Sequence, residues 1–202
     1  PGEAAGVPRV VGQSVVLRSG VQEFAVSLRC PRFVLDGSVA GGALPLRVKG
    51  GLSGGHQIEV SYPPQSLGTN GLLEARLRLG WAAAEGVLYK WAEFRLKDAP
   101  SPVLLEEVVL EEAELPRETP QLEGSGVQSY PAFWRGFFAG IEFPVAATRI
   151  EGQRLIVAHR PGWTLQNGEW RQSRKAVFGV APERSERNAF GRYITARRPK
   201  PA

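Results

Sequence analysis

The side chains that could carry out chemistry are few and lie far apart along the chain. The two histidines, His56 and His159, have no second histidine, cysteine or suitably spaced carboxylate near them in the sequence. Zinc and copper sites need such neighbouring ligands, so we expect no metal site. The glycine-rich stretch 50–55 lacks the Lys-Ser/Thr ending of a phosphate-binding loop and is typical of a hairpin turn. We expect no cofactor and no catalytic residue, and hence no enzyme in this chain alone.

Acidic residues gather in one stretch near the middle of the chain. Its glutamates are Glu106, Glu107, Glu111, Glu112 and Glu114. A pair of carboxylates flanking a sugar could hydrolyse a glycosidic bond. Neighbouring acids along one strand are more typical of a solvated strand edge, which is the interpretation we favour. The single cysteine, Cys30, lies in an apolar stretch and is expected to be a buried, unreactive thiol.

Aromatic residues accumulate in the C-terminal half. Trp134, Trp163 and Trp170 carry flat indole rings of the kind on which the C–H face of a sugar can stack. Aromatic residues in β proteins mostly belong to the core, and that is the competing interpretation. Together with Glu142, these three residues are our candidate carbohydrate-binding residues.

Glu142 shares one face of an apolar segment with Phe138 and two glycines. A carboxylate that is removed from water there needs a partner, which Arg149 or Arg135 could provide. A structural ion pair is the favoured interpretation, and contact with a bound ligand is the alternative.

Composition and charge limit the possible partners. Of the 202 residues 43% are hydrophobic, and no run approaches the ~18 apolar residues that span a bilayer, so we expect a folded domain without a membrane partner. Residues 149–202 carry 12 Lys/Arg against 4 Asp/Glu. The densest part, Arg184–Lys200, could meet a polyanion, but a basic face that is solvated or docks another domain is more common, so we expect no nucleic acid.

Alternation of apolar and polar residues predicts mostly strands. The best hairpin joins Leu73–Trp81 to Val87–Leu96, and a phase slip in the second segment predicts a β-bulge near Trp91 and Ala92. A helix is expected after Ser185, with an apolar stripe that packs against the strands. Other strands are expected at Arg9–Leu17, Glu23–Arg29, Leu44–Val48, Gln57–Tyr62, Val103–Leu110, Gly136–Ala146, Arg149–His159 and Trp170–Val180.

These elements predict an all-β fold, a large antiparallel β-sandwich with one C-terminal helix. We divide the chain into a first part of the sandwich (1–97), an acidic crossover segment (98–123), a second part of the sandwich (124–182) and the C-terminal helix with a proline-rich exit linker (183–202).

The C-terminal half resembles a known family. The segments Phe137–Ala146, Ser173–Pro182, Arg187–Ile194 and Arg197–Pro199 are similar to the N-terminal β-sandwich of bacterial α-galactosidase-like glycoside hydrolases. In that family a (β/α)8 barrel follows the sandwich and holds both catalytic carboxylates. The resemblance implies a non-catalytic accessory domain that packs against a catalytic barrel, in the same or a companion chain, and that could shape substrate access. The alternative is an independent carbohydrate-binding module that uses exposed tryptophans.

Overall fold

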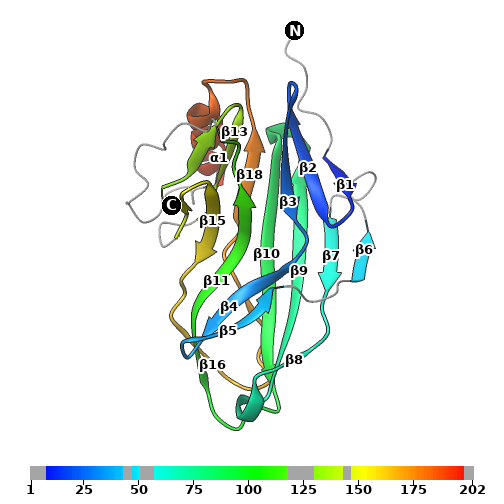
Figure 1. The fold of residues 1–202 in the computed structure, drawn as a ribbon, viewed down its shortest axis with the longest axis vertical. Coiled ribbons are helices and arrows are strands. Elements are labelled where there is room, and N and C mark those ends of the chain that lie inside the picture. Colours follow the sequence, from blue (N-terminus) through cyan, green and yellow to red (C-terminus); the bar gives the residue numbers. More distant parts are fainter. Residues whose placement is uncertain (1–7, 43–46, 51–56, 118–129, 143–146, 198–202) are drawn as a thin grey trace.

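The computed structural model describes residues 8–42, 47–50, 57–117, 130–142 and 147–197, with only the backbone described at 47, 48 and 50. Within this part of the chain the structure is a β-sandwich of antiparallel sheets with a single α-helix near the C-terminal end (Figure 1). The predicted all-β class is therefore confirmed. His56, residues 51–55 of the expected turn, the start of the expected strand at Leu44, the end of the expected strand at 143–146 and the proline-rich exit linker at 198–202 lie outside the described residues.

The larger sheet has nine strands. It contains the longest uninterrupted antiparallel pair, β9 and β10, whose strands run most of the length of the molecule (Figure 1). In spatial order its strands are β12 (Ala132–Trp134), β13 (Phe137–Ile141), β18 (Ala176–Val180), β10 (Val87–Lys97), β9 (Leu72–Ala82), β7 (Gln57–Ser61) and β6 (Arg47–Gly50), with β8 (Gln65–Ser66) beside β9 and β17 (Arg171–Gln172) beside β10. Two 3-10 turns, Gly68–Asn70 and Ala83–Glu85, precede β9 and β10.

The second layer is a six-stranded sheet centred on one long strand. Its order is β14 (Arg149–Glu151), β15 (Arg154–His159), β11 (Val103–Glu114), β4 (Cys30–Leu35) and β5 (Ser38–Gly42), with β16 (Trp163–Leu165) also beside β11. A further three-stranded sheet comprises β1 (Arg9–Val11), β2 (Ser14–Ser19) and β3 (Gln22–Ser27), and β3 lies against β11. The strand expected at Val103–Leu110 within the acidic crossover is thus confirmed and extends to Glu114.

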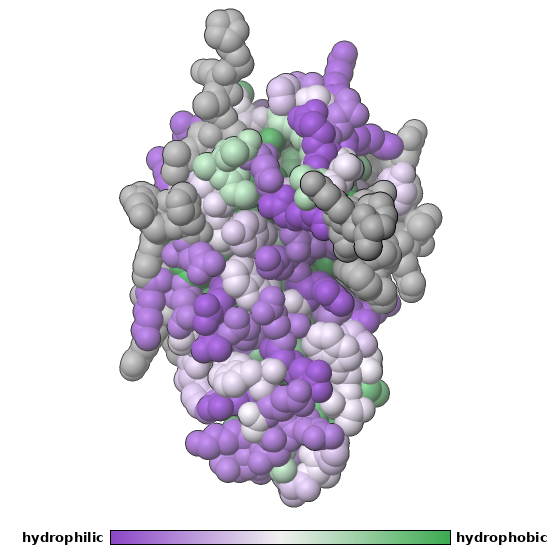
Figure 2. Space-filling model, turned by 180° about the vertical axis from the view of Figure 1, so that it is seen from behind, coloured by the Kyte–Doolittle hydropathy of each residue, from purple (hydrophilic) through white to green (hydrophobic). Residues whose placement is uncertain are grey.

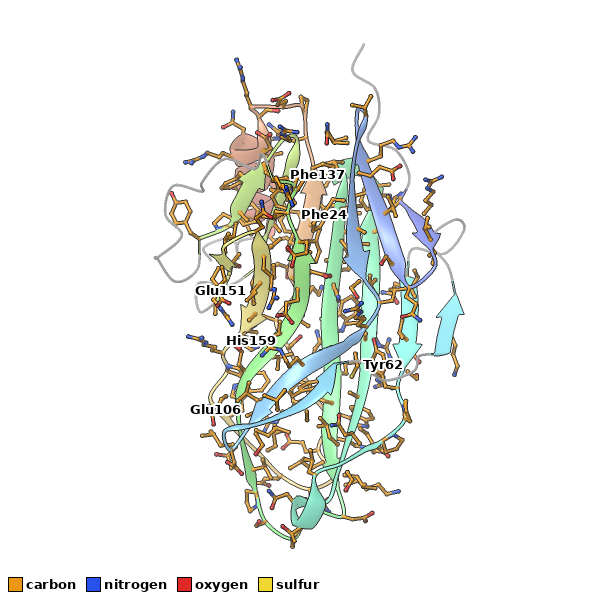
Figure 3. All side chains as sticks on the ribbon, viewed as in Figure 1. Phe24, Tyr62, Glu106, Phe137, Glu151 and His159 are labelled. Carbon is orange, nitrogen blue, oxygen red and sulfur yellow. The ribbon has the colours of Figure 1, made fainter. Side chains whose placement is uncertain are left out.

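One apolar core fills the space between the layers and draws on all three sheets. Phe24 of β3 and Phe137 of β13 meet in it with ring centroids 6.0 Å apart (Figure 3). Cys30 belongs to this core, and burial raises the pKa of its thiol to about 12. The predicted burial of Cys30 is confirmed, and the raised pKa keeps the nucleophilic thiolate scarce at neutral pH.

The hairpin of β9 and β10 is confirmed, but the predicted bulge in β10 is wrong. The two strands pair without interruption from Val87 opposite Ala82 to Lys97 opposite Leu72. The irregularity lies on the other side of β10, where three residues, 173–175, face the two residues Trp91 and Ala92. There the hydroxyl of Ser173 accepts the Ala92 N–H at 3.0 Å, in place of a backbone carbonyl.

The helix α1 (Glu186–Arg197) is confirmed, and so is its docking on the sandwich. Tyr193 is buried, and Ala189, Phe190 and Ile194 pack with it against Val87, Phe138 and Val177 of the nine-stranded sheet. Phe138 pairs with Gly179 across the strands, and a Cβ atom at Gly179 would overlap the Phe138 ring. Ser185 precedes the helix, as expected of an N-cap residue. Its hydroxyl, however, donates to the Pro182 carbonyl at 2.5 Å.

Three other predicted strands are divided in the structure. The segment Arg9–Leu17 spans β1 and the start of β2, which form a hairpin that turns at Gly12 with a positive φ of 59°. The segment Arg149–His159 forms the hairpin of β14 and β15, which turns at Gly152 with a positive φ of 63°. The segment Trp170–Val180 is divided into β17 and β18 at the irregularity opposite β10. Among the described residues no helix is long and apolar enough to cross a membrane.

Candidate functional site

The three candidate tryptophans lie in three different environments and form no common surface. Trp134 in β12 is 3% exposed. Its ring packs edge-on against Phe24, with centroids 5.0 Å apart, and stacks near Phe137 at 5.8 Å. Trp134 is therefore a core residue, and the prediction that it offers a sugar-binding face is corrected.

Trp163 in β16 is partly buried and packs against the core. His159 meets its ring edge-on, with centroids 5.4 Å apart. Burial lowers the pKa of His159 to about 4, and the positive charge of Arg174 acts in the same direction. The imidazole is therefore neutral near pH 7, and its Nδ1 accepts the backbone N–H of Arg174 at 3.4 Å.

Trp170 is the most exposed of the three, at 37%. The guanidinium carbons of Arg76 and Arg95 lie 4.3 and 4.7 Å from the centre of its ring. Cations at this distance are attracted to the electron-rich face of an indole. The ring of Trp170 is thus held on the nine-stranded sheet by two arginines, with part of its surface open to solvent.

These arginines belong to a ladder of ion pairs on the outer face of β9 and β10, which we call the outer ladder. Arg76 pairs with Glu93 at 2.5 Å, and Arg95 pairs with Glu74 at 2.6 Å, both between directly opposite residues. Arg78 extends the ladder by contacting Glu93 and Glu59 at 3.1 Å each. Hydrophilic residues predominate on the side of the molecule opposite to that of Figure 1 (Figure 2).

Glu142 is partnered by the helix rather than by Arg149. The Tyr193 hydroxyl donates a short hydrogen bond to Glu142, and Nε of Arg197 lies 3.6 Å from the same carboxylate. Burial and the adjoining carboxylate raise the pKa of Tyr193, so its hydroxyl stays a donor. Arg149 instead pairs with Glu107 at 3.0 Å and with Glu151 at 2.9 Å. The favoured interpretation of Glu142 as a structural partner fits this geometry.

The acidic stretch is not a solvated edge throughout, because two of its glutamates are buried in β11. Glu107 is bridged by Arg149 at 3.0 Å and by Arg160 at 2.9 Å. Glu111 lies on the other side of the sheet, between the layers, where it meets a lysine of β10. The structure therefore corrects the predicted exposure at these two positions.

Lys90 and Glu111 form an ion pair inside the sandwich, each with only 1% of its side chain exposed. The Lys90 ammonium donates to Glu111 Oε2 at 3.0 Å and to the Ser27 carbonyl at 2.6 Å. The Ser27 N–H in turn donates to Glu111 Oε2 at 3.0 Å. The pair thus satisfies both backbone groups of Ser27 where β3 lies against β11, and joins three sheets at one point.

One oxygen of this buried pair, Glu111 Oε1, is excluded from solvent and has no hydrogen-bond partner of standard geometry within the described part of the chain. Burial raises the pKa of the Glu111 carboxyl, and the charge of Lys90 opposes this change. A cavity of about 130 Å³ adjoins the pair and is lined by Ser27, Arg29, Cys30, Arg32, Gly42, Lys90, Val109, Leu110, Glu111 and Glu112.

The sequence contains a signal for this site in the pattern of β10. Leu88, Ala92, Phe94 and Leu96 alternate along β10 and face the core, and Lys90 occupies the one remaining position of that set. A charged residue in an otherwise apolar alternation was taken as a change of phase. The alternative, a buried lysine, requires a carboxylate in the opposite layer, and the acidic stretch supplies Glu111.

No protein-family model matches this chain, and no curated protein matches it. The resemblance to α-galactosidase-like proteins therefore depends on the quoted segments alone. Two of those segments form β18 and α1, which pack on each other. Among the described residues there is no group of three or more His, Cys, Asp or Glu side chains that could hold a metal ion.

Proposed function

We propose that this chain is a non-catalytic accessory β-sandwich domain of an α-galactosidase-like carbohydrate-active protein, and that a catalytic barrel packs against its C-terminal helix. The observation that carries the proposal is the way α1 is mounted. One face of the helix is fixed to the sandwich by apolar contacts and hydrogen bonds, whereas the opposite face is presented outward.

The fixed face is anchored at both ends. Glu186 in the first turn accepts the Gly136 N–H at 2.6 Å from a buried position. Arg197 in the last turn pairs with Glu85 at 2.8 Å, which ties the helix to the turn between β9 and β10. Because two separate loops hold the helix, it is a rigid support rather than a loosely attached tail.

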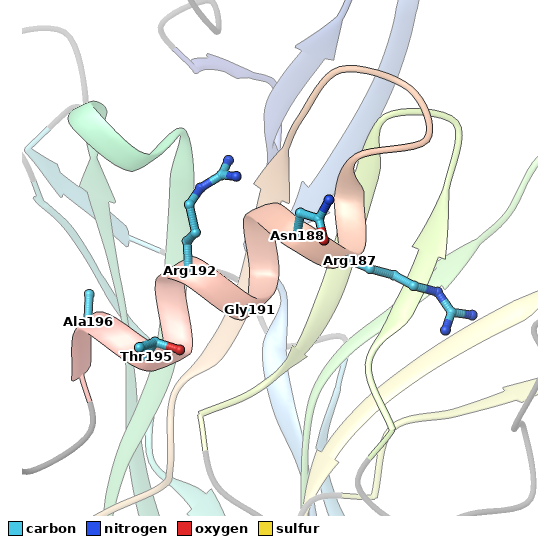
Figure 4. Close-up of a pocket in the computed structure, with 6 residues that line it drawn as sticks. All are labelled: Arg187, Asn188, Gly191, Arg192, Thr195 and Ala196. Atoms are coloured by element: carbon cyan, nitrogen blue, oxygen red, sulfur yellow. The ribbon is translucent and has the colours of Figure 1, made fainter.

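The outward face combines small side chains with two extended cations. A shallow surface hollow on it is lined by Arg187, Asn188, Gly191, Arg192, Thr195 and Ala196 (Figure 4). Arg187 and Arg192 extend away from the helix axis in different directions (Figure 4). Small residues between two arginines allow close approach of another element while offering charge-assisted hydrogen bonds at its margins. A partner with carboxylates at its rim would match this face.

The proposal is tested by determining the complete reading frame and expressing the protein that it encodes. If a catalytic barrel packs against α1 in that protein, it should protect the helix from proteolysis. The paired change Arg187→Glu and Arg192→Glu should remove this protection. Arg18→Glu, on the exposed surface of β2, is the matched control and should leave it unchanged. A reading frame without a barrel, together with a helix equally protected in both variants, would overturn the proposal.

The second candidate function is an independent carbohydrate-binding module, and the exposure of Trp170 favours it. Polar groups of the outer ladder lie beside this ring, so a sugar stacked on the indole could also receive hydrogen bonds from Arg76 or Arg95. A soluble galacto-oligosaccharide should then quench tryptophan fluorescence, and Trp170→Ala should abolish the quenching while Trp163→Phe preserves it. Quenching that survives Trp170→Ala would remove this residue from the candidate site.

A further inference from the structure

Residues 166–175, which we call the crossing strip, connect the six-stranded sheet to the nine-stranded sheet. The strip begins after Leu165 of β16 and ends before Ala176 of β18, and both of these flanking residues are buried. Within the strip only Ser173 is buried. It pairs with β10 through the two residues of β17 and through a single bridge between Asn167 and Leu96. A segment with so few buried contacts opens locally at a smaller cost in free energy than the surrounding core.

His159, at the end of β15, fastens the strip to the opposite layer (Figure 3). Its side chain is 4% exposed, and its Nδ1 accepts the backbone N–H of Arg174 at 3.4 Å. Since β15 belongs to the six-stranded sheet and the strip runs beside β10 at this point, the bond crosses between the layers. One residue earlier, the Ser173 N–H donates to the Ala92 carbonyl at 2.9 Å. Adjacent residues of the strip are thus bound to a strand of each sheet.

Only the neutral imidazole can accept the hydrogen bond from Arg174. Nδ1 accepts it through a lone pair, and protonation would convert this atom into a donor that faces another N–H. The positive charge of Arg174 already acts against protonation of the ring. Trp163, which meets the imidazole edge-on, carries no charge that could compensate. Protonation therefore removes the bond and adds repulsion between like charges.

The neighbouring strand β11 supplies no counter-charge for a protonated ring. Val108 lies directly opposite His159. Glu107 is the next residue of that strand, and adjacent side chains of a strand point to opposite faces of its sheet. The Glu107 carboxylate is held by Arg149 and Arg160 at 3.0 and 2.9 Å. It is therefore directed away from the imidazole and is already engaged by two cations.

The crossing strip also carries Trp170, whose ring lies over Arg76 and Arg95 of the outer ladder. We propose that protonation of His159 releases the crossing strip from the nine-stranded sheet while both layers stay folded, so that acid withdraws Trp170 from the outer ladder. The strip is in effect a strap that is fastened at neutral pH. This device is built from contacts within the chain and depends on neither the docking of a barrel nor the binding of a sugar.

Amide hydrogen exchange between pH 8 and pH 5 tests the proposal. The pKa of His159 is about 4 when the strip is fastened and is expected to return toward 6.5 on release. The released state therefore binds the proton more readily, and its population should rise roughly thirtyfold between pH 8 and pH 5. The N–H groups of Ser173 and Arg174 should lose protection by this factor, after division by the exchange rates of an unstructured peptide. The N–H of Leu77, in the central strand β9, should not.

Three variants separate the role of the imidazole from other effects of acid. His159→Gln retains an acceptor that does not titrate in this range, so protection of Arg174 should be the same at pH 8 and pH 5. His159→Leu removes the acceptor and should release the strip at both pH values. Glu169→Gln is the matched control, because it removes a titratable group of the strip that pairs with Arg171. It should leave the thirtyfold response unchanged.

The fluorescence of Trp170 gives a second measurement of the same event. Its emission should shift to longer wavelength as the pH falls from 8 to 5, and Trp170→Phe should remove the shift. Unchanged protection of Arg174 over this range, or a response that His159→Gln retains, would overturn the proposal. An equal loss of protection at Leu77 would also overturn it, because the whole domain would then unfold rather than the strip alone.

Discussion

Opposite faces of the hairpin β9–β10 carry the same kinds of charged residues in contrasting environments. On the outside, Arg76, Arg95 and their glutamates form a chain of partly exposed ion pairs. On the inside, Lys90 is a single charge among apolar side chains and reaches across to Glu111. Solvent can replace a lost partner in the outer ladder, but it cannot do so between the layers.

The difference shows what each arrangement contributes. Exposed ion pairs add little stability because water and salt screen them and because both side chains lose mobility. A buried pair pays a large desolvation penalty that its attraction only partly offsets, so its presence is weak support for high stability. The inner pair instead connects the sheets, because it hydrogen-bonds the backbone N–H and carbonyl of Ser27 and so joins β3, β10 and β11 at one point.

The largest predicted effect is the removal of one member of the buried pair. Glu111→Ala or Lys90→Ala should each lower the free energy of unfolding by about 3–5 kcal/mol, because the remaining charge stays buried without its partner. Both changes also leave a backbone group of Ser27 unsatisfied. Urea denaturation followed by circular dichroism measures the change.

The paired change Lys90→Met and Glu111→Leu is the matched control for those two variants. It removes both charges, and similar replacements elsewhere are neutral or stabilising by about 1–4 kcal/mol. We expect a smaller loss of stability than in either single variant, because no charge is left buried without a partner, although both backbone groups of Ser27 lose theirs. A double variant as unstable as either single one would show that the pair contributes net stability, which would reverse the contrast with the outer ladder.

An intermediate effect is expected on acidification, through His159. Its pKa is lowered from 6.5 to about 4 in the folded chain. The unfolded chain therefore binds a proton at this histidine more readily than the folded chain does. The contribution of the neutral ring to folding stability is complete above pH 6.5. This contribution should be lost as the pH falls from about 6.5 to 4. Glu111 acts in the opposite direction, because its raised pKa favours proton uptake by the folded state. Thermal unfolding across this pH range should therefore show a decline that His159→Gln reduces.

The smallest predicted effect lies in the outer ladder. Arg95→Ala removes its ion pair with Glu74 and one of the two cations over Trp170. The loss should be about 0.2–1 kcal/mol, as is typical of exposed pairs, and it should shrink at high salt. A double-mutant cycle with Glu74→Ala isolates the pair. A coupling as large as the effect of Glu111→Ala would remove the distinction between the two faces.

The sequence predicted the elements whose pattern is set by local alternation. The β9–β10 hairpin and the apolar stripe of α1 were found because each has a face that must be buried, and periodicity records this directly. The turn at Gly152 was missed although the polar run Glu151–Arg154 around the glycine marks it. The positive φ at this position favours glycine.

The candidate site was less predictable because it depends on contacts between distant segments. Trp134 could equally have faced solvent, and only its position beside Phe24, more than a hundred residues earlier, places it in the core. Lys90 and Glu111 come from different sheets, so neither residue indicated the other. Glu142 was correctly expected to need a partner, but Tyr193 and Arg197 became neighbours only when α1 folded back.

The position of Phe138 over Gly179 makes the docking of α1 visible by spectroscopy. The ring covers the glycine on the adjacent strand and in turn meets Phe190 of the helix, with centroids 5.6 Å apart. Protons held over the face of an aromatic ring are shielded by its ring current, so the Hα resonances of Gly179 should lie well upfield of ordinary glycine values. If the helix detached, the ring would lose the contact that fixes its orientation, and these resonances would move back. A single glycine signal could thus report, in solution and without a label on the helix, whether α1 is seated.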